Sequence, residues 1–380
     1  MKRRCSVVLA MLLAVLVCWA DNWMGDLDDT TYLSQVSIPG THDSCTGEGW
    51  SGFIATLSGP SMGTTQDLTI ARQLDCGVRA FDLRPCVNGS SLAINHGILQ
   101  TKADFKSTVA QLCRFVTDNP TEFVIVIMRH ESDGDDGNSN WAQMVSECLS
   151  DKELRERLAD YKRDITVGEL RGKVLILSRD SYADTPIGGF LTGWGHAADY
   201  ITGTIKGINT GNYYVQDYYE VMSDKENKLR GIQKLLDYST ANNIKRGYRH
   251  LIICFNHTSG YTKSASTDGN RENAALCNQA VIDYLNKKAG PAGIVIMDFA
   301  GTDRSGSHNV NGLKLVNTII ENNKKYTPVK AANPNSITMM PYGQGASSTC
   351  HDLSGRPIDT AANLKCRHGI FILNGKKIAK

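Results

Sequence analysis

Four continuous apolar runs, each ending abruptly on polar residues, dominate the pattern of this chain. They cover residues 123–128, 174–177, 251–255 and 294–297. Uninterrupted runs of this length predict strands that are buried on both faces, as in a parallel sheet covered by helices. Between and around them, apolar residues recur at helical spacing in 105–117, 141–161, 224–242, 272–288 and 310–322. Strands that alternate with helices predict repeated βα units.

The segment Gly77–Arg84 has a different pattern, which bears on function. In a strand, alternate residues share a face. One face would therefore carry two charged residues, Asp82 and Arg84, while Phe81 and Leu83 would lie on the other, facing the helices. The fold predicted by these patterns is α/β, a distorted TIM-type (β/α)8 barrel. Its active site is expected at the C-terminal ends of the strands, where polar residues gather in this sequence.

The two ends of the chain differ from its middle. Residues 1–20 combine Lys2, Arg3 and Arg4 with a short apolar core, the pattern of a secretory signal peptide. We expect cleavage after about Ala20 and a secreted protein, extracellular or on the cell surface. Residues 21–325 would form the barrel, and the stretch 326–350, with its Pro, Gly, Ser and Thr residues, a linker. A small β-rich tail is expected over 351–380, and it resembles the sorting or attachment tails of exported bacterial proteins.

Charge and cysteine content narrow the classes of partner and site. The chain carries 41 basic and 39 acidic side chains, and three of the basic ones lie in the expected leader. This balance argues against a nucleic-acid partner. The cysteines are scattered and form no CxxC pair, so the sequence does not favour a zinc site. We expect a monomer.

Two histidines, two carboxylates and one arginine stand at the ends of strand-like runs in the first third of the sequence. They are His42, Asp43, Asp82, Arg84 and His96. Together they provide the groups needed to accept a proton, neutralise a phosphate and protonate a leaving oxygen. This combination predicts phosphodiester chemistry.

Six segments carry a resemblance to a known family. They are Ser37–Ser44, Phe81–Arg84, Asn95–Gly97, Asp118–Glu122, Leu170–Lys173 and Met297–Asp298. With them, residues from about 30 to 300 resemble the X domain of phosphatidylinositol-specific phospholipase C, and in particular its secreted bacterial members. The resemblance implies a phosphatidylinositol diacylglycerol-lyase that releases diacylglycerol and inositol 1,2-cyclic phosphate.

The catalytic roles follow from the resemblance and from the chemistry of each group. His42 is the candidate base, because imidazole exchanges a proton near neutral pH. The resemblance makes Asp298 its partner and His96 the acid, with Asp43 supporting the proton transfer. Arg84 would neutralise the phosphate. It stands where the calcium-dependent animal enzymes have an acidic residue, so we expect no metal and no cofactor.

Substrate recognition is predicted on the same grounds. The resemblance implies an inositol pocket of Asp82, Arg129, Arg179, Asp217 and Tyr219. The partner would be a membrane surface containing phosphatidylinositol, contacted transiently. Aromatic and aliphatic residues favour such an interface, and two groups are candidates for it: Trp50, Phe53 and Ile54, or Phe190, Leu191 and Trp194. The histidines other than His42 and His96 are interpreted as ordinary surface or core residues.

Two other interpretations remain open at this point. One is a non-catalytic barrel that binds inositol or glycans. The other is a metal-dependent glycerophosphodiester phosphodiesterase, which would need a cluster of carboxylate ligands that Arg84 disrupts. Within the favoured interpretation, glycosylated phosphatidylinositol anchors are an open second class of substrate.

Overall fold

The structure, a computed structural model, describes residues 22–221, 224–245 and 250–328 and four short strands between residues 350 and 379. The expected leader (1–20) and most of the expected linker (326–350) lie outside the described residues. The chain divides into two units, Met1–Ala332 and Asn333–Lys380.

Nine strands of the described chain close into a ring in the larger unit, because β8 pairs back onto β6. Around the ring the order is β6-β2-β1-β13-β12-β11-β10-β9-β8. The strands are β1 (Ile38–Thr41), β2 (Ala80–Leu83), β6 (Val124–Met128), β8 (Val174–Ser178), β9 (Gly189–Thr192), β10 (Ile201–Lys206), β11 (Gly211–Gln216), β12 (Ile252–His257) and β13 (Ile294–Met297). Only β10, among these nine, runs antiparallel to its neighbours. The distorted TIM-type barrel is confirmed, and the distortion is this reversed strand.

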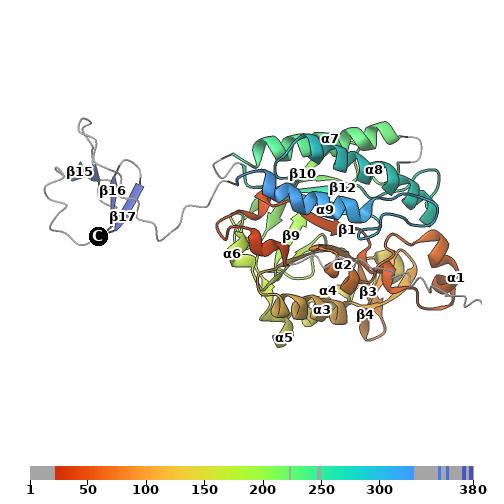
Figure 1. Ribbon diagram of the computed structural model, residues 1–380. Coiled ribbons are helices and arrows are strands. Elements are labelled where there is room, and N and C mark those ends of the chain that lie inside the picture. The colour runs from red at the N-terminus through yellow and green to blue at the C-terminus, as the bar shows by residue number, and fades with distance from the viewer. Residues whose placement is uncertain are drawn as a thin grey trace, which may run out of the picture. The chain divides into compact units, whose positions relative to one another are not determined.

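Helices surround the ring, and α7, α8 and α9 lie side by side over one flank of it (Figure 1). The α-helices are α1 (Phe53–Met62), α2 (Ile70–Asp75), α3 (Phe105–Asp118), α4 (Trp141–Leu149), α5 (Lys152–Arg155), α6 (Val167–Leu170), α7 (Lys225–Asn242), α8 (Thr267–Lys287) and α9 (Gly312–Asn322). Short 3-10 turns include η1 (Trp23–Asp26), η2 (Leu33–Gln35), η3 (Ser44–Glu48), η4 (Ser132–Gly134) and η6 (Asn323–Lys325). No helix in the described part of the chain has the length and apolar character to span a bilayer.

The longest departure from the predicted helices is in 141–161. This stretch forms α4, then α5, then the two-residue strand β7 (Leu158–Ala159), which pairs with the start of β8. The break has a local cause, since the side chain of Asp151 accepts a hydrogen bond from the Glu153 amide and caps a new helix. The remaining predicted helices agree with the structure to within a few residues.

Two further sheets complete the described chain. The first has three antiparallel strands, β3 (Pro85–Asn88), β4 (Ser91–His96) and β5 (Leu99–Asp104). It follows directly on β2 and carries His96 at the end of β4. The second lies in the C-terminal unit, with the order β15 (Pro357–Ile358), β14 (Cys350–His351), β16 (Ile370–Leu373) and β17 (Lys376–Ala379). The small β-rich tail is thus observed.

Strand register brings the expected catalytic residues together. Thr41, the last residue of β1, pairs with Phe81 on β2 and with Met297 on β13. The residues that follow these three along the sequence are His42, Asp82 and Asp298. Because the three strands are parallel and in register, all three side chains lie near the same end of the barrel. Gly40 permits the close approach of β1 and β2, because a Cβ there would lie 2.9 Å from the Cβ of Ala80.

Candidate active site

His42 is held between two carboxylates that come from different segments. Its Nδ1 lies 2.9 Å from Oδ1 of Asp298, which directly follows β13. The second oxygen of Asp298 accepts a hydrogen bond from the Gly260 amide at 3.2 Å. The Nε2 of His42 lies 3.3 Å from Oδ2 of Asp43. Asp298 therefore orients the ring, and Nε2 is the nitrogen left for a reaction.

Arg84 sits among three carboxylates. Its Nε lies 2.8 Å from Oδ1 of Asp43, its Nη2 2.9 Å from Oδ2 of Asp82, and its Nη1 3.4 Å from Oε2 of Glu131. Oδ2 of Asp82 also accepts a hydrogen bond from the Asp43 amide at 3.1 Å. The guanidinium is largely buried, with 11% of its side chain exposed. Its direction is therefore fixed by partners on three segments.

Asp43 joins the second predicted histidine to this cluster. Its Oδ2 lies 3.1 Å from Nδ1 of His96 as well as 3.3 Å from Nε2 of His42. The two imidazole rings stand 6.5 Å apart between centroids, with their planes inclined at 69°. One carboxylate thus lies between two imidazoles and beside a guanidinium, so the five predicted catalytic residues form one connected cluster.

The charges around His42 and Asp82 shift the pKa values of both side chains strongly. Burial alone would lower the pKa of His42, but the carboxylates of Asp43 and Asp298 outweigh this effect and raise the pKa to about 9. Burial would raise the pKa of Asp82, yet the neighbouring Arg84 guanidinium holds the pKa of this carboxyl well below its usual range. At neutral pH and without substrate, these two shifts favour an imidazolium at His42 and an ionised carboxylate at Asp82.

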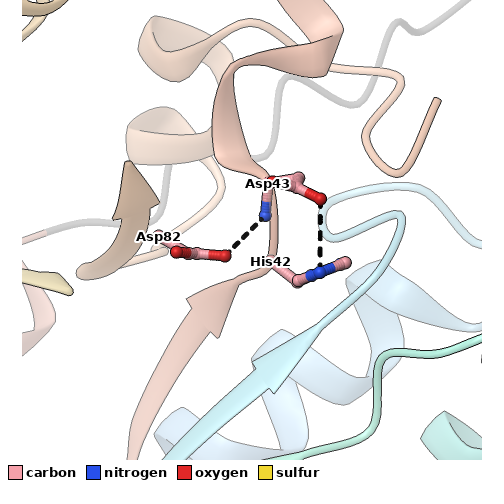
Figure 2. Close-up of side chains that lie close together, drawn as sticks. All are labelled: His42, Asp43 and Asp82. Carbon is pink, nitrogen blue, oxygen red and sulfur yellow. Dashed lines mark hydrogen bonds and ion pairs between the residues drawn. The ribbon is translucent and has the colours of Figure 1, made fainter. Parts of the chain in front are cut away.

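A small cation could in principle bind where His42, Asp43 and Asp82 meet. One atom from each of these residues lies within 4.8 Å of the other two (Figure 2). However, both carboxylates already pair with the Arg84 guanidinium, at 2.8 and 2.9 Å. A divalent ion beside a guanidinium would meet repulsion. The arrangement therefore fits a site in which the arginine itself provides the positive charge.

The residues predicted to bind substrate lie partly around one cavity. Arg129 and Arg179 line a cavity of about 370 Å³, together with Asp180, Phe190, Leu191, Thr192, Gly193 and Trp194. The Arg179 guanidinium stacks over the Trp194 ring at 4.5 Å and lies 4.0 Å from Oδ2 of Asp217. The indole Nε1 of Trp194 donates to the same oxygen at 2.8 Å. Arg129, Arg179 and Asp217 are therefore brought together.

Tyr219 lies further out than the other predicted pocket residues. Its side chain is exposed, and its ring contacts within the described residues are with His196, at 4.5 Å between centroids, and with Tyr261, at 6.5 Å. Tyr219 is not among the residues that line the cavity with Arg129 and Arg179, so its predicted place in the inositol pocket is not observed.

Three residues of the site were not predicted from the sequence. Glu131 is the third carboxylate on Arg84, and Trp194 contacts Arg179 and Asp217. His257, at the end of β12, lies between the two groups, with its ring centroid 6.4 Å from that of His42 and 5.7 Å from that of Trp194. Burial lowers the pKa of His257 to about 4, so this ring is neutral. In the sequence it stands two residues after the apolar run 251–255, and this was the only signal for it.

The membrane interpretation of Phe190, Leu191 and Trp194 is not supported by their positions. Leu191 is buried in β9, and the Trp194 indole is hydrogen-bonded to Asp217. In the other candidate group, Trp50 is also buried, whereas Phe53 and Ile54 are strongly exposed. The candidates for an interface are thereby reduced to the two residues that begin α1.

Comparison with known proteins gives a consistent result. Residues 39–180 match the family described as phosphatidylinositol-specific phospholipase C, X domain. The 1-phosphatidylinositol phosphodiesterase of Listeria monocytogenes is 29% identical over 285 residues, covering 73% of this chain and 80% of the relative. The enzyme of that name from Staphylococcus aureus is 24% identical over 319 residues, covering 80% of this chain and 94% of the relative.

Solved structures share the fold. The phosphatidylinositol-specific phospholipase C of Listeria monocytogenes superposes with a TM-score of 0.59 at 23% identity, over 79% of this chain and 97% of that protein. A mutant of the Staphylococcus aureus enzyme gives a TM-score of 0.64 at 20% identity, over 79% of this chain and 97% of that protein. The X-domain match over residues 39–180, the two sequence relatives and the shared barrel all make the chain similar to the bacterial phosphatidylinositol-specific phospholipases C.

Proposed function

We propose that this chain is a secreted phosphatidylinositol diacylglycerol-lyase that needs no metal ion. It would cleave phosphatidylinositol into diacylglycerol and inositol 1,2-cyclic phosphate. The observation that carries the proposal is the Asp43 carboxylate, which lies between the His42 and His96 imidazoles and against the Arg84 guanidinium. A base, an acid and a fixed cation are thereby placed around one small volume.

The first step is removal of a proton from the inositol 2-hydroxyl by Nε2 of His42. Asp298 holds Nδ1–H, which fixes the tautomer with a free lone pair on Nε2 when the ring is neutral. The hydroxyl is a neighbour of the phosphorylated ring carbon, so the nucleophile is intramolecular and has a very high effective concentration. In the free protein Oδ2 of Asp43 lies 3.3 Å from Nε2. The substrate hydroxyl therefore replaces Asp43 as the partner of this nitrogen.

The second step is transfer of the phosphorus from the glycerol oxygen to the 2-oxygen. Negative charge grows on the non-bridging oxygens, and Arg84 can donate to them from a planar, permanently charged group. His96 protonates the departing diacylglycerol oxygen, and Asp43, at 3.1 Å from its Nδ1, stabilises the charged ring before that transfer. The bond from phosphorus to the glycerol oxygen breaks as the bond to the 2-oxygen forms. The proton that His42 accepts is matched by the proton that His96 donates.

Recognition of the inositol ring is assigned to the cavity of about 370 Å³ beside this cluster. Arg129 and Arg179 offer forked donors to ring hydroxyls, and Asp217 offers an acceptor. The Trp194 indole, which stacks on Arg179, provides a flat wall next to them. Tyr219, which is exposed, would meet the outer part of the headgroup.

Turnover of defined vesicles tests the proposal. Release of diacylglycerol is measured from vesicles of phosphatidylinositol and, separately, of phosphatidylcholine, each in excess EDTA. We expect release from phosphatidylinositol only. Binding to phosphatidylinositol without release would favour a non-catalytic binding barrel, and release that requires an added divalent ion would favour a metal-dependent glycerophosphodiester phosphodiesterase. Either result would contradict the proposed function.

The pH dependence of kcat/KM follows from the environment of His42. A base must be deprotonated, so kcat/KM should rise with pH until the pH passes the pKa of the free enzyme's imidazole, about 9. Asp43→Asn removes one of the two carboxylates that raise this pKa. The rising limb should therefore move to lower pH in this variant, whatever its absolute rate. A limb at the same pH in both proteins would exclude His42 as the titrating base.

The helix α1 is proposed as the membrane contact. Phe53, Ile54, Leu57 and Met62 are more than half exposed, while Ala55 and Gly59 are buried, Gly59 against the Trp50 ring. Ile98, also exposed, lies two residues after His96 in the turn between β4 and β5. An apolar surface of this kind beside the catalytic cluster suits insertion into a lipid interface.

A double substitution tests this contact. Phe53→Ser with Leu57→Ser is expected to weaken binding to phosphatidylinositol vesicles, measured by sedimentation, by about 10²- to 10⁴-fold, because each of the two side chains contributes about 1.5–3 kcal/mol when it is buried in the lipid. Turnover of monomeric short-chain phosphatidylinositol should change little. Ile208→Ser is the matched control, since Ile208 is equally exposed but precedes β11, at the opposite end of the barrel. Equal losses in both variants would refute the assignment of α1.

A further inference from the structure

Thr65 and Gln66 are polar residues with no place in the proposed chemistry, yet both are completely buried. They lie in the segment between α1 and α2. One hydroxyl group holds their backbone in place, since the amides of Thr65 and Gln66 both donate to Oγ1 of Thr46, at 3.2 and 3.0 Å. The dipeptide is therefore a fixed part of the barrel end that carries the catalytic cluster.

The Gln66 amide side chain joins the ends of β1 and β13. Its Nε2 donates to the carbonyl oxygen of His42 at 3.0 Å and to that of Met297 at 2.9 Å. Its Oε1 accepts a hydrogen bond from the Ala300 amide at 3.0 Å. Both donor positions and the acceptor are used, and all three partners belong to the segments that carry His42 and Asp298. A side chain with another pattern of donors and acceptors could not make these bonds.

Thr65 adds bonds to the same two segments. Its Oγ1 lies within hydrogen-bond distance of the carbonyl oxygens of His42 and Asp43, at 3.2 and 3.3 Å. Its own carbonyl oxygen accepts from the Phe299 amide at 2.7 Å. The dipeptide therefore contacts the residue after His42 and the residue after Asp298 as well as the strand ends themselves.

Both of those following residues have left-handed backbone. Asp43 has a φ of 42° and Phe299 a φ of 56°. This region is unfavourable for residues other than glycine, and for a bulky residue such as Phe it persists only where the surroundings enforce it. Phe299 is fully buried, and its amide is one of those bound by the dipeptide. The two sharp turns that direct the His42 and Asp298 side chains toward each other are thus held by the same pair of residues.

We infer that Gln66, assisted by Thr65, is a positioning residue that fixes the contact between His42 and Asp298. It contacts neither the phosphate site nor the inositol cavity, so its effect passes entirely through the geometry of the His42 and Asp298 pair. The inference deepens the proposed function and its consequences for turnover rest on it. The geometric part can be measured without any substrate.

The experiment is a titration of the His42 ring by NMR in the substrate-free protein, with the signal assigned from its loss in His42→Ala. The charged and titratable groups that face this ring are Asp43, Asp82, Arg84, His96, His257 and Asp298. Only the relation to Asp298 should change in Gln66→Met, which keeps the volume and loses all three hydrogen bonds. We expect the pKa of His42 to fall by about one unit or more, as an imidazolium loses a well-placed carboxylate.

Gln73→Met is the matched control. Gln73 is also completely buried, and its Nε2 donates to the carbonyl oxygens of Ser44 and Leu68 at 2.8 and 2.6 Å. Its bond to the segment after β1 is at Ser44, two residues beyond His42, and among its hydrogen bonds in the described chain none goes to the segment after β13 that carries Asp298. This variant should lose stability like Gln66→Met while the pKa of His42 stays unchanged. Equal shifts in both variants, or no shift in a folded Gln66→Met, would overturn the inference.

Thr65→Val provides a second route if Gln66→Met does not fold. It keeps the shape of the side chain and the backbone bond to Phe299 but removes the hydroxyl. A smaller fall in the pKa of His42 than in Gln66→Met supports the inference, and an unchanged pKa overturns it.

In the active enzyme we expect Gln66→Met to lower kcat by about 10- to 100-fold with KM within about threefold. If the variants show these pKa shifts but the wild-type protein cleaves no phosphatidylinositol, the proposed function is refuted and the positioning role stands.

Discussion

Replacing His42 by alanine is expected to reduce turnover of phosphatidylinositol by about 10³- to 10⁴-fold, because the variant lacks the group that removes the 2-hydroxyl proton. His96→Ala should have an effect of similar size through the leaving group. Both rings lie at the open end of the barrel and neither packs in the core, so thermal unfolding should stay cooperative. Initial rates on phosphatidylinositol vesicles and a melting curve for each variant provide the measurement.

The control for this result is a histidine with a comparable carboxylate partner elsewhere. His308 lies 3.0 Å from Oδ1 of Asp268, outside the candidate site. His308→Ala should leave the rate unchanged. Substantial turnover in a folded His42→Ala protein would remove His42 from the mechanism, because no other imidazole of the described residues contacts Asp298.

Replacing Arg84 is expected to separate the charge of this residue from its shape. Arg84→Lys keeps one positive charge for Asp43, Asp82 and Glu131 but loses the planar fork, so we expect a folded protein whose kcat is lower by about 10²- to 10³-fold. Arg84→Ala leaves buried carboxylates without their partner. It should lose at least as much activity and also about 3–5 kcal/mol in the free energy of unfolding.

Arg79 offers a matched comparison for the stability effect. It forms a fully buried pair with Glu122, with its Nε 2.8 Å from Oε2, near the start of β2 and away from the cluster. Arg79→Lys should lower the free energy of unfolding without a loss of kcat beyond the folded fraction. If Arg84→Lys retained wild-type turnover, the guanidinium geometry would be irrelevant to the phosphate and the proposed mechanism would be wrong.

The free site suggests how substrate binding and proton transfer are coupled. Asp43 lies against Arg84, His42 and His96 at once, at 2.8, 3.3 and 3.1 Å. In the proposed mechanism, a bound phosphodiester would bring its own negative charge to Arg84 and its hydroxyl to His42. Asp43 would then be left with His96, the residue proposed to carry the proton. Entry of the substrate would therefore prepare the acid while it occupies the base.

Much of the barrel could be predicted because its parallel strands are continuous apolar runs. The runs that became β6, β8, β12 and β13 are buried on both faces, so hydrophobicity alone marks them. The segment that forms β9, β10 and β11 was not predicted. Its strands contain Gly and Thr and are partly exposed, so their pairing depends on long-range antiparallel contacts that no local pattern records.

The candidate site was predictable where a residue stands alone at the end of a strand. Asp298 follows directly on an apolar run and His42 follows directly on the short strand β1, and the register of β1 and β13 brings them together. Glu131 follows two other polar residues after β6, and nothing in that order shows that it is the one that turns back to Arg84. Trp194 and Gln66 lie in segments between regular elements. Their roles depend on partners far away in the sequence, so only the folded chain reveals them.

The most direct test of the central claim is phosphorus NMR of the products formed from phosphatidylinositol in excess EDTA. If His42 activates the inositol 2-hydroxyl and Arg84 replaces a metal ion, the first product is the five-membered cyclic inositol 1,2-phosphate, and it accumulates with the chelator present. Appearance of inositol 1-phosphate as the first product, or no product until a divalent cation is supplied, would contradict the account.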